Sequence, residues 1–234
     1  GGCAGTGIKN ASFEKGTGEK IEGWTAYNYE RSAGEADAGT IAITDRGYSG
    51  RGILITNKIA NDNRIHQEIK TARGAYYKVS VMVKIVGVID GDAGGAAGAG
   101  FNISAINASY RSEALYTTND DWTEYTAYIK TGKNQTTVDL SIGIGGYSSE
   151  SSGSAYVDEV SVTKVSSLPS GAAAVSVEDI SKSREAEKGT TAKEIWLKVL
   201  FGVLTAALAA FVILVIKKHD EDEYAQKHPL TEKS

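Results

Sequence analysis

From Gly7 to Val165, apolar and polar residues alternate in short runs that are bounded by Gly, Asn, Asp and Ser. The longest run, Tyr77 to Ile85, carries an apolar residue at every second position. Because successive side chains of a strand point to opposite faces, this period predicts strands with one buried face each. About nine or ten such runs occur with no helical period among them, which predicts an all-β fold, an antiparallel β-sandwich. A parallel α/β fold is excluded because it needs crossover helices.

A different pattern follows in the run from Ile195 to Ile216, IWLKVLFGVLTAALAAFVILVI, in which Lys198 is the only charged residue. As a helix this run is about 33 Å long, enough for a hydrocarbon core of about 30 Å. Lys198 lies near the end of the run and can reach the membrane surface. The run therefore predicts one transmembrane helix.

The charged residues after this helix predict its orientation. Lys217 and Lys218 follow the apolar run directly, and positive residues favour the cytoplasmic side. The chain is therefore expected in the cell membrane as a single-pass protein, with the N-terminal domain outside and the C-terminus in the cytoplasm.

The expected organisation has five parts, because composition changes at each boundary. They are an N-terminal flank (1–7), the β-sandwich (8–165), a small and polar stalk (166–194), the transmembrane helix (195–216) and a cytoplasmic tail (217–234).

Charge and cysteine content exclude some classes of function. The net charge is −4, and the Lys and Arg residues of the sandwich are scattered, whereas a nucleic-acid surface needs them clustered. Nucleic acid is therefore not an expected partner. Cys3 is the only cysteine, so an internal disulfide is impossible.

Catalytic patterns are weak in this sequence. No Ser-His-Asp order is evident, His66 has no obvious partner, and no pair of carboxylates is placed for glycoside hydrolysis. The chain is expected not to be an enzyme, although an enzyme fused upstream or bound as a partner is left open.

Six short motifs in the β-region resemble those of one class of protein. Ile8 to Glu14 is similar to I-x-N-G-x-F-E, with Ala11 in place of the usual Gly, and Gly23-Trp24 follows it. The other four are Tyr48 to Leu54, Ile65 to Ile69 with the following VSVMVK strand, Trp122, and Ala155 to Val160. Together they resemble carbohydrate-binding modules of the cellulose- and xylan-binding type, families four, nine and twenty-two, which have a galactose-binding-domain-like jelly roll.

The resemblance implies a structural calcium ion held by Glu14 and Asp158 together with backbone carbonyl groups. Calcium prefers six to eight hard oxygen ligands, and such a site would join the first and last strands. The alternative interpretation is that Asp158 caps a turn and Glu14 is solvated.

The resemblance also implies a glycan-binding face with Gln67 on it. Sugar recognition needs flat aromatic rings and polar groups for the hydroxyls, so the candidate contacts are Gln67, Tyr27, Tyr29, Tyr110 and Tyr147. Tyr48, Phe101 and Tyr116 are further aromatic candidates. One departure counts against sugar binding: related binders often carry an aromatic residue before the Gln67 strand, where this chain has Asn61-Asp62-Asn63.

Two functional hypotheses follow. The first is a non-catalytic extracellular module that binds polysaccharide or cell-surface glycan, with attachment to a glycoside hydrolase or another surface enzyme left open. The second is a structural or protein-interaction ectodomain, a subunit of a cell-surface assembly that keeps the jelly roll without binding sugar. The tyrosines and Gln67 favour the first hypothesis, and the missing aromatic residue favours the second.

Overall fold

The computed structural model describes residues 6–91, 99–181 and 195–218, except for 202, 206 and 209. The chain divides into two compact units, Gly1–Ile180 and Ser181–Ser234. The predictions for the flank before residue 6, the stalk at 182–194 and the tail from 219 onward lie outside the described residues.

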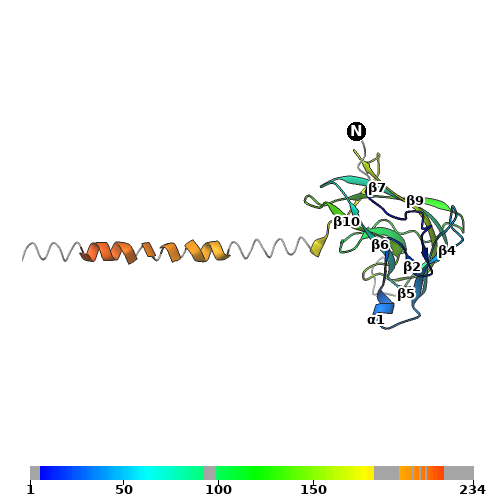
Figure 1. Ribbon diagram of the computed structural model, residues 1–234, viewed down its shortest axis with the longest axis horizontal. Helices are drawn as coiled ribbons and strands as arrows, with labels where there is room; N and C mark the ends of the chain where they lie inside the picture. The colour runs from blue at the N-terminus through cyan, green and yellow to red at the C-terminus, as the bar shows by residue number, and fades with distance from the viewer. Residues whose placement is uncertain are drawn as a thin grey trace, which may run out of the picture. The chain divides into compact units, whose positions relative to one another are not determined.

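The first unit is a sandwich of two sheets (Figure 1). The four-stranded sheet has the order β3-β6-β10-β8, with bounds Thr25–Asn28, Asn63–Lys70, Thr137–Ile144 and Phe101–Ala105. The six-stranded sheet has the order β12-β9-β7-β11-β5-β4, with bounds Ala174–Ser176, Thr123–Lys130, Tyr76–Asp90, Ser151–Val165, Gly52–Asn61 and Gly39–Thr44. Every strand pair in these sheets is antiparallel except β12 with β9, which confirms the predicted antiparallel fold.

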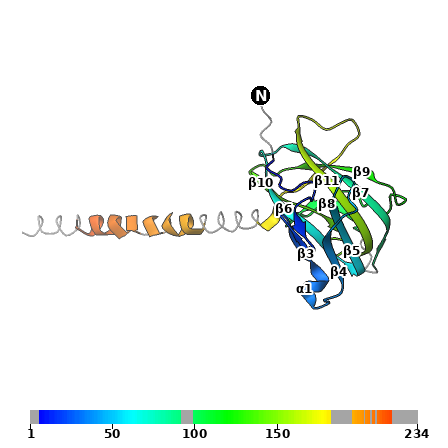
Figure 2. The same ribbon diagram turned by 45° about the vertical axis from the view of Figure 1, so that its right-hand side comes forward.

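Two small elements complete this unit. The short strands β1 (Gly16–Thr17) and β2 (Lys20–Ile21) pair with each other, and the single-turn helix α1 (Tyr29–Ala33) connects β3 to β4. Asn28 caps α1 by accepting a hydrogen bond from Arg31 N, and Gly34 ends the helix in the left-handed conformation. In Figure 1 and Figure 2, α1 lies at one end of the sandwich.

The core lies between the inner faces of the two sheets. Val79, Val81, Val83 and Ile85 of β7 are fully buried, as the period-two run predicts, and Leu140 of β10 is buried against them in one cluster. Burying a side chain of this size contributes about 1.5–3 kcal/mol, so the alternation itself drives the two sheets together.

The domain extends further along the chain than predicted. The sequence pattern ended the sandwich at residue 165, but β12 lies within the expected stalk and pairs with the edge of β9. Val177, directly after β12, is 1% exposed, and its N–H donates to Lys130 O at 3.0 Å. Farther along, Ile180 N donates to Asn107 O at 3.1 Å. The strand was missed because three small residues carry no readable period, whereas a free sheet edge can pair with them.

The second unit contains a helix from Ile195 to Lys218, with a mean hydropathy of 2.9 over its most apolar window. Its length and composition suffice to cross a membrane, so the predicted apolar helix is present. Its insertion into a membrane and its orientation stay predictions.

Candidate functional site

The outer face of the four-stranded sheet carries polar side chains in register. On β6, Ile65 and Ile69 point into the core, so the alternate residues Arg64, His66 and Glu68 face outward. Strand pairing aligns them in three rows, which are Tyr27, Arg64, Gly143 and Asn102; Thr25, His66, Ser141 and Ser104; and Glu68 with Asp139. This polar face, called the outer face below, is the candidate site.

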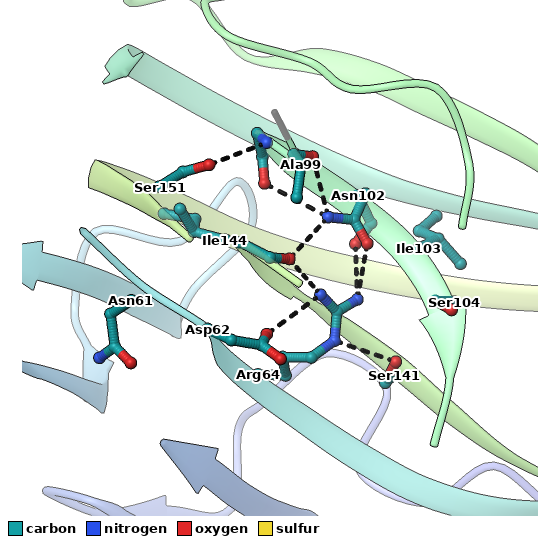
Figure 3. A network of polar contacts seen from close by, with 12 residues as sticks. Asn61, Asp62, Arg64, Ala99, Asn102, Ile103, Ser104, Ser141, Ile144 and Ser151 are labelled. Atoms are coloured by element: carbon teal, nitrogen blue, oxygen red, sulfur yellow. Dashed lines mark hydrogen bonds and ion pairs between the residues drawn. The ribbon is translucent and has the colours of Figure 1, made fainter. Parts of the chain in front are cut away.

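Arg64 lies at the centre of a hydrogen-bond network on this face (Figure 3). Its Nε donates to Ser141 Oγ at 3.1 Å, Nη1 donates to Gly145 O at 2.6 Å, and Nη2 donates to Asn102 Oδ1 at 2.8 Å. The side chain passes over Gly143, where a Cβ atom would lie 2.8 Å from Arg64 Cγ. The same Cβ atom would clash with Asn63 O and lie 2.7 Å from Arg64 Cα, so Gly143 lets the backbone of β6 and the stem of Arg64 approach β10 closely.

The carboxylate of Asp62 faces Arg64, but its Oδ1 accepts no hydrogen bond from the part of the chain that the structure describes. The residue is 8% exposed, and its Oδ1 lies 3.6 Å from Arg64 Nη1, which is an ion pair too long to be a hydrogen bond. Burial raises the pKa of the Asp62 carboxyl, and the positive charge of Arg64 opposes this change. Burial likewise lowers the pKa of Arg64. Asp62 is therefore a desolvated acceptor with unused capacity.

A cluster of asparagine amides holds Asp62 in this position. Asp62 is the single residue between β5 and β6, where the chain passes from one sheet to the other. Asn57 Nδ2 donates to Asn61 O at 3.2 Å and to Ser151 O at 2.9 Å, and Asn61 Nδ2 donates to Asn28 Oδ1 at 2.8 Å. The run Asn61-Asp62-Asn63, which counted against sugar binding in the sequence, therefore builds this side of the site.

Arg111 is a further candidate residue of this site that the sequence analysis did not identify. It is half-buried, and a Cβ atom on Gly146 would lie 2.9 Å from its Nη1. Its charge lowers the pKa of both Asp62 and Arg64, so the three groups are close in space. Within the described ranges, its guanidinium makes no hydrogen bond and no ion pair at 4 Å or less. Arg111 thus offers unused donors beside the unused acceptor.

The four predicted sugar-contacting tyrosines are all exposed, although they differ in their relation to the outer face. Tyr27 is 38% exposed in the same row as Arg64, and burial followed by the charge of Asp62 raises its pKa. Tyr29 N donates to Asp62 O at 3.0 Å, and Tyr110 O accepts from Ser104 Oγ at 2.7 Å. Tyr147 lies in the loop after β10 and is 90% exposed. Tyr27 is the aromatic ring whose position beside Asp62 and Arg64 is fixed by strand pairing.

The three further aromatic candidates have other roles. Phe101 is fully buried in the core, Tyr116 Oη donates to Asp90 Oδ2 at 2.7 Å, and Tyr48 packs its ring against Trp122 at a centroid distance of 5.8 Å.

Gln67 contacts the backbone of the N-terminal segment, and its predicted role in sugar binding stays a prediction. Gln67 pairs with Leu140, which is fully buried, so the Gln67 side chain projects from the face of the sheet that packs on the core. Gln67 Oε1 accepts from Lys9 N at 2.6 Å, and Nε2 donates to Lys9 O at 3.0 Å. Both ends of the amide bind backbone, so Gln67 fastens the N-terminal segment to β6, and these two bonds use one N–H and one lone pair of the amide.

A pocket of about 340 Å³ lies at the other end of the outer face. It is lined by Lys9, Gly23, Thr25, His66, Gln67, Glu68 and Asp139. His66, which has no obvious partner in the sequence, places Nδ1 at 2.8 Å from Asp139 Oδ1. The other ring nitrogen of His66, Nε2, takes no part in this pair and is available for other contacts.

The two carboxylates predicted to bind calcium lie close together. Asp158 is fully buried and accepts hydrogen bonds from Ser49 N at 2.9 Å and Glu159 N at 2.7 Å. Burial raises its pKa, and the negative charge of Glu14 adds to this effect. Glu14 Oε1 accepts from Arg51 N at 2.9 Å, so both side chains hold the same turn.

These carboxylates fit a calcium ion as a pair of hard oxygen ligands. Neither forms an ion pair with a Lys or Arg of the described residues, so a cation would offset their charge. The described residues contain no group of three His, Cys, Asp or Glu side chains that could hold a metal. Calcium bound here would therefore take its remaining ligands from backbone carbonyls or water.

Comparison with known proteins gives structural similarity only. No protein-family model and no curated protein sequence matches this chain. A solved carbohydrate-binding module of family 4 has 18% sequence identity and a TM-score of 0.42, over 68% of this chain and 99% of that module. The CBM22-1 xylan-binding domain of Paenibacillus barcinonensis Xyn10C has 18% identity and a TM-score of 0.41, over 68% and 94%. TmCBM61, solved with β-1,4-galactotriose, has 15% identity and a TM-score of 0.40, over 68% and 97%. These are modules of the class that the sequence motifs resemble.

Proposed function

We propose that this chain binds a saccharide on the outer face of the four-stranded sheet without catalysing a reaction on it. The observation that carries the proposal is a buried acceptor beside a free donor. Asp62 is 8% exposed and its Oδ1 accepts no hydrogen bond, and the guanidinium of the neighbouring Arg111 donates none, within the part of the chain that the structure describes.

This arrangement suits neighbouring hydroxyl groups. A sugar hydroxyl can donate to Asp62 while the oxygen of the next one accepts from Arg111, and both partners are charged, which strengthens each hydrogen bond. Tyr27 is 38% exposed in the adjoining position and offers a flat ring to the apolar face of a pyranose. Arg64 and Arg111 are balanced by Asp62 and Glu150, so this end of the face suits a neutral sugar.

The same proposal places the sandwich outside the cell membrane. The apolar helix Ile195–Lys218 supports membrane anchoring by its length and composition, and the lysines after it favour an outer N-terminal domain. Calcium held by Glu14 and Asp158 would stabilise the turn between them. Attachment to a glycoside hydrolase or to a surface assembly is compatible with this arrangement.

The test is a binding measurement on the full chain in detergent micelles or nanodiscs. Isothermal titration with neutral oligosaccharides of glucose, xylose and galactose is expected to show selective binding to one of them. Arg111→Ala removes hydrogen bonds from a charged donor, worth about 1.5–3 kcal/mol, and should weaken binding by roughly 10-fold or more. Asp62→Asn should weaken binding in the same direction.

The matched control is Arg73→Ala, which removes an exposed arginine that lies outside the outer face. Its affinity should equal that of the unchanged protein. Absence of binding to all the sugars, or equal losses of sugar affinity in Arg111→Ala and Arg73→Ala, would contradict the proposal and favour a protein-interaction ectodomain.

A further inference from the structure

We propose that the pocket formed by Lys9, Thr25, His66, Glu68 and Asp139 binds the protonated amino group of an amino sugar in the same saccharide chain. This inference rests on the proposed function and adds a substrate class to it. The saccharide would place hydroxyl groups at Asp62 and Arg111 and an ammonium group at the opposite end of the outer face.

The pocket and the arginine network are parts of one continuous surface. Arg64, His66 and Glu68 are alternate residues of β6, and their partners on β10 are Gly143, Ser141 and Asp139. Alternate residues of a strand are about 6.6 Å apart, so Glu68 lies about 13 Å along the strand from Arg64. A short oligosaccharide can therefore contact both ends of the face.

The charge of the pocket favours a cation. Glu68 and Asp139 are directly opposite each other on neighbouring strands, where side chains of like charge are destabilising. The Asp139 carboxylate contacts His66, while Glu68 makes no ion pair or hydrogen bond within the described ranges. Lys9 lines the same pocket, but its ammonium pairs with neither carboxylate among the residues described. Two carboxylates therefore face the pocket with no neutralising partner other than His66.

An ammonium group fits this environment better than a hydroxyl or a metal ion. Three N–H donors match the free oxygens of Glu68 and Asp139 and the hydroxyl of Thr25, which also lines the pocket. A hydroxyl would leave the charge of the carboxylates uncompensated. A divalent metal finds no group of three ligating side chains here or elsewhere in the described residues.

The test compares three hexasaccharides of equal length: glucosamine, N-acetylglucosamine and glucose. Titration uses the full chain in nanodiscs, at a pH where the glucosamine amine is protonated. We expect the glucosamine oligomer to bind at least 10-fold more tightly than the other two. Glu68→Gln keeps the size of an exposed side chain and should remove this preference for the glucosamine oligomer. Lys9→Gln removes the competing ammonium and should increase the preference.

Glu124→Gln is the matched control, because Glu124 is an exposed acid on β9 of the other sheet. It should leave the preference unchanged. Equal binding of the three oligomers, or equal effects of Glu68→Gln and Glu124→Gln, would overturn the ammonium subsite and leave the proposed function intact. Absence of binding by all three oligomers would overturn both.

Discussion

Replacing Arg64 by methionine tests whether the network on the outer face stabilises the sandwich. Arg64→Met keeps most of the apolar stem and removes the guanidinium. Asn102 Oδ1 loses its donor at 2.8 Å, while Gly145 O keeps a second hydrogen bond from Asn102 Nδ2 at 2.9 Å. Asp62, 8% exposed, loses its counter-charge at 3.6 Å. Removing one member of a buried ion pair costs about 3–5 kcal/mol, so we expect a loss of that size in the free energy of unfolding.

The measurement is urea unfolding of the full chain in micelles, followed by tryptophan fluorescence. Trp24 is 8% exposed in the core, so its emission reports the folding of the sandwich. The control is Arg46→Met, an exposed arginine whose Nη1 lies 3.4 Å from Tyr156 Oη and whose replacement should change stability by less than about 0.5 kcal/mol. Adding Asp62→Asn to Arg64→Met should recover part of the loss, because it removes the uncompensated carboxylate. An Arg64→Met protein as stable as the Arg46→Met control would refute this account of the network.

Three further predictions concern other parts of the domain. Because burial raises the pKa of Asp62 above 3.8 in the folded state, the folded protein binds this proton more tightly than the unfolded chain. The free energy of unfolding should therefore fall as pH rises from 3.8 through the raised pKa, and Asp62→Asn should remove this part of the pH dependence. If the stability of Asp62→Asn and that of the unchanged protein vary with pH in parallel, the prediction is wrong. Calcium at 100 times its dissociation constant should raise the free energy of unfolding by about 2.7 kcal/mol, and Asp158→Asn should abolish the rise. Equal responses of the unchanged protein and Asp158→Asn to added calcium would exclude the site. Val177→Ala removes two buried methyl groups and should cost roughly 1.6 kcal/mol in the free energy of unfolding, while a neutral result in urea unfolding would contradict the packing of Val177 in the core.

The alternation also contained information about Gln67 that the resemblance to known modules obscured. Ile65, Gln67 and Ile69 share one face of β6, and His66 and Glu68 share the other. The period therefore placed Gln67 with the core residues, whereas its expected role in sugar binding came from the family motif. Its amide satisfies the backbone of Lys9 instead, as a buried polar group requires.

Much of the candidate site was beyond prediction because its residues are distant in sequence. Arg64 meets Asn102, which is 38 positions away, and His66 meets Asp139, which is 73 positions away. Alternation states which face of its own strand a residue occupies, but not which strand lies beside it. The run Asn61-Asp62-Asn63 was the one local signal, but the sequence analysis used it only as evidence against sugar binding.

The sequence by itself determined the long strands of the sandwich, the buried stripe of β7 and the apolar helix, because periodicity and composition act within a single segment. Only the tertiary structure decided the order of the strands, the pairing of β12 with β9 and the meeting of Asp62, Arg64 and Arg111. These features depend on hydrogen-bond register and on burial between segments far apart in the chain. The carboxylate of Asp62 is a desolvated acceptor because of the residues packed around it, which its own residue type does not determine.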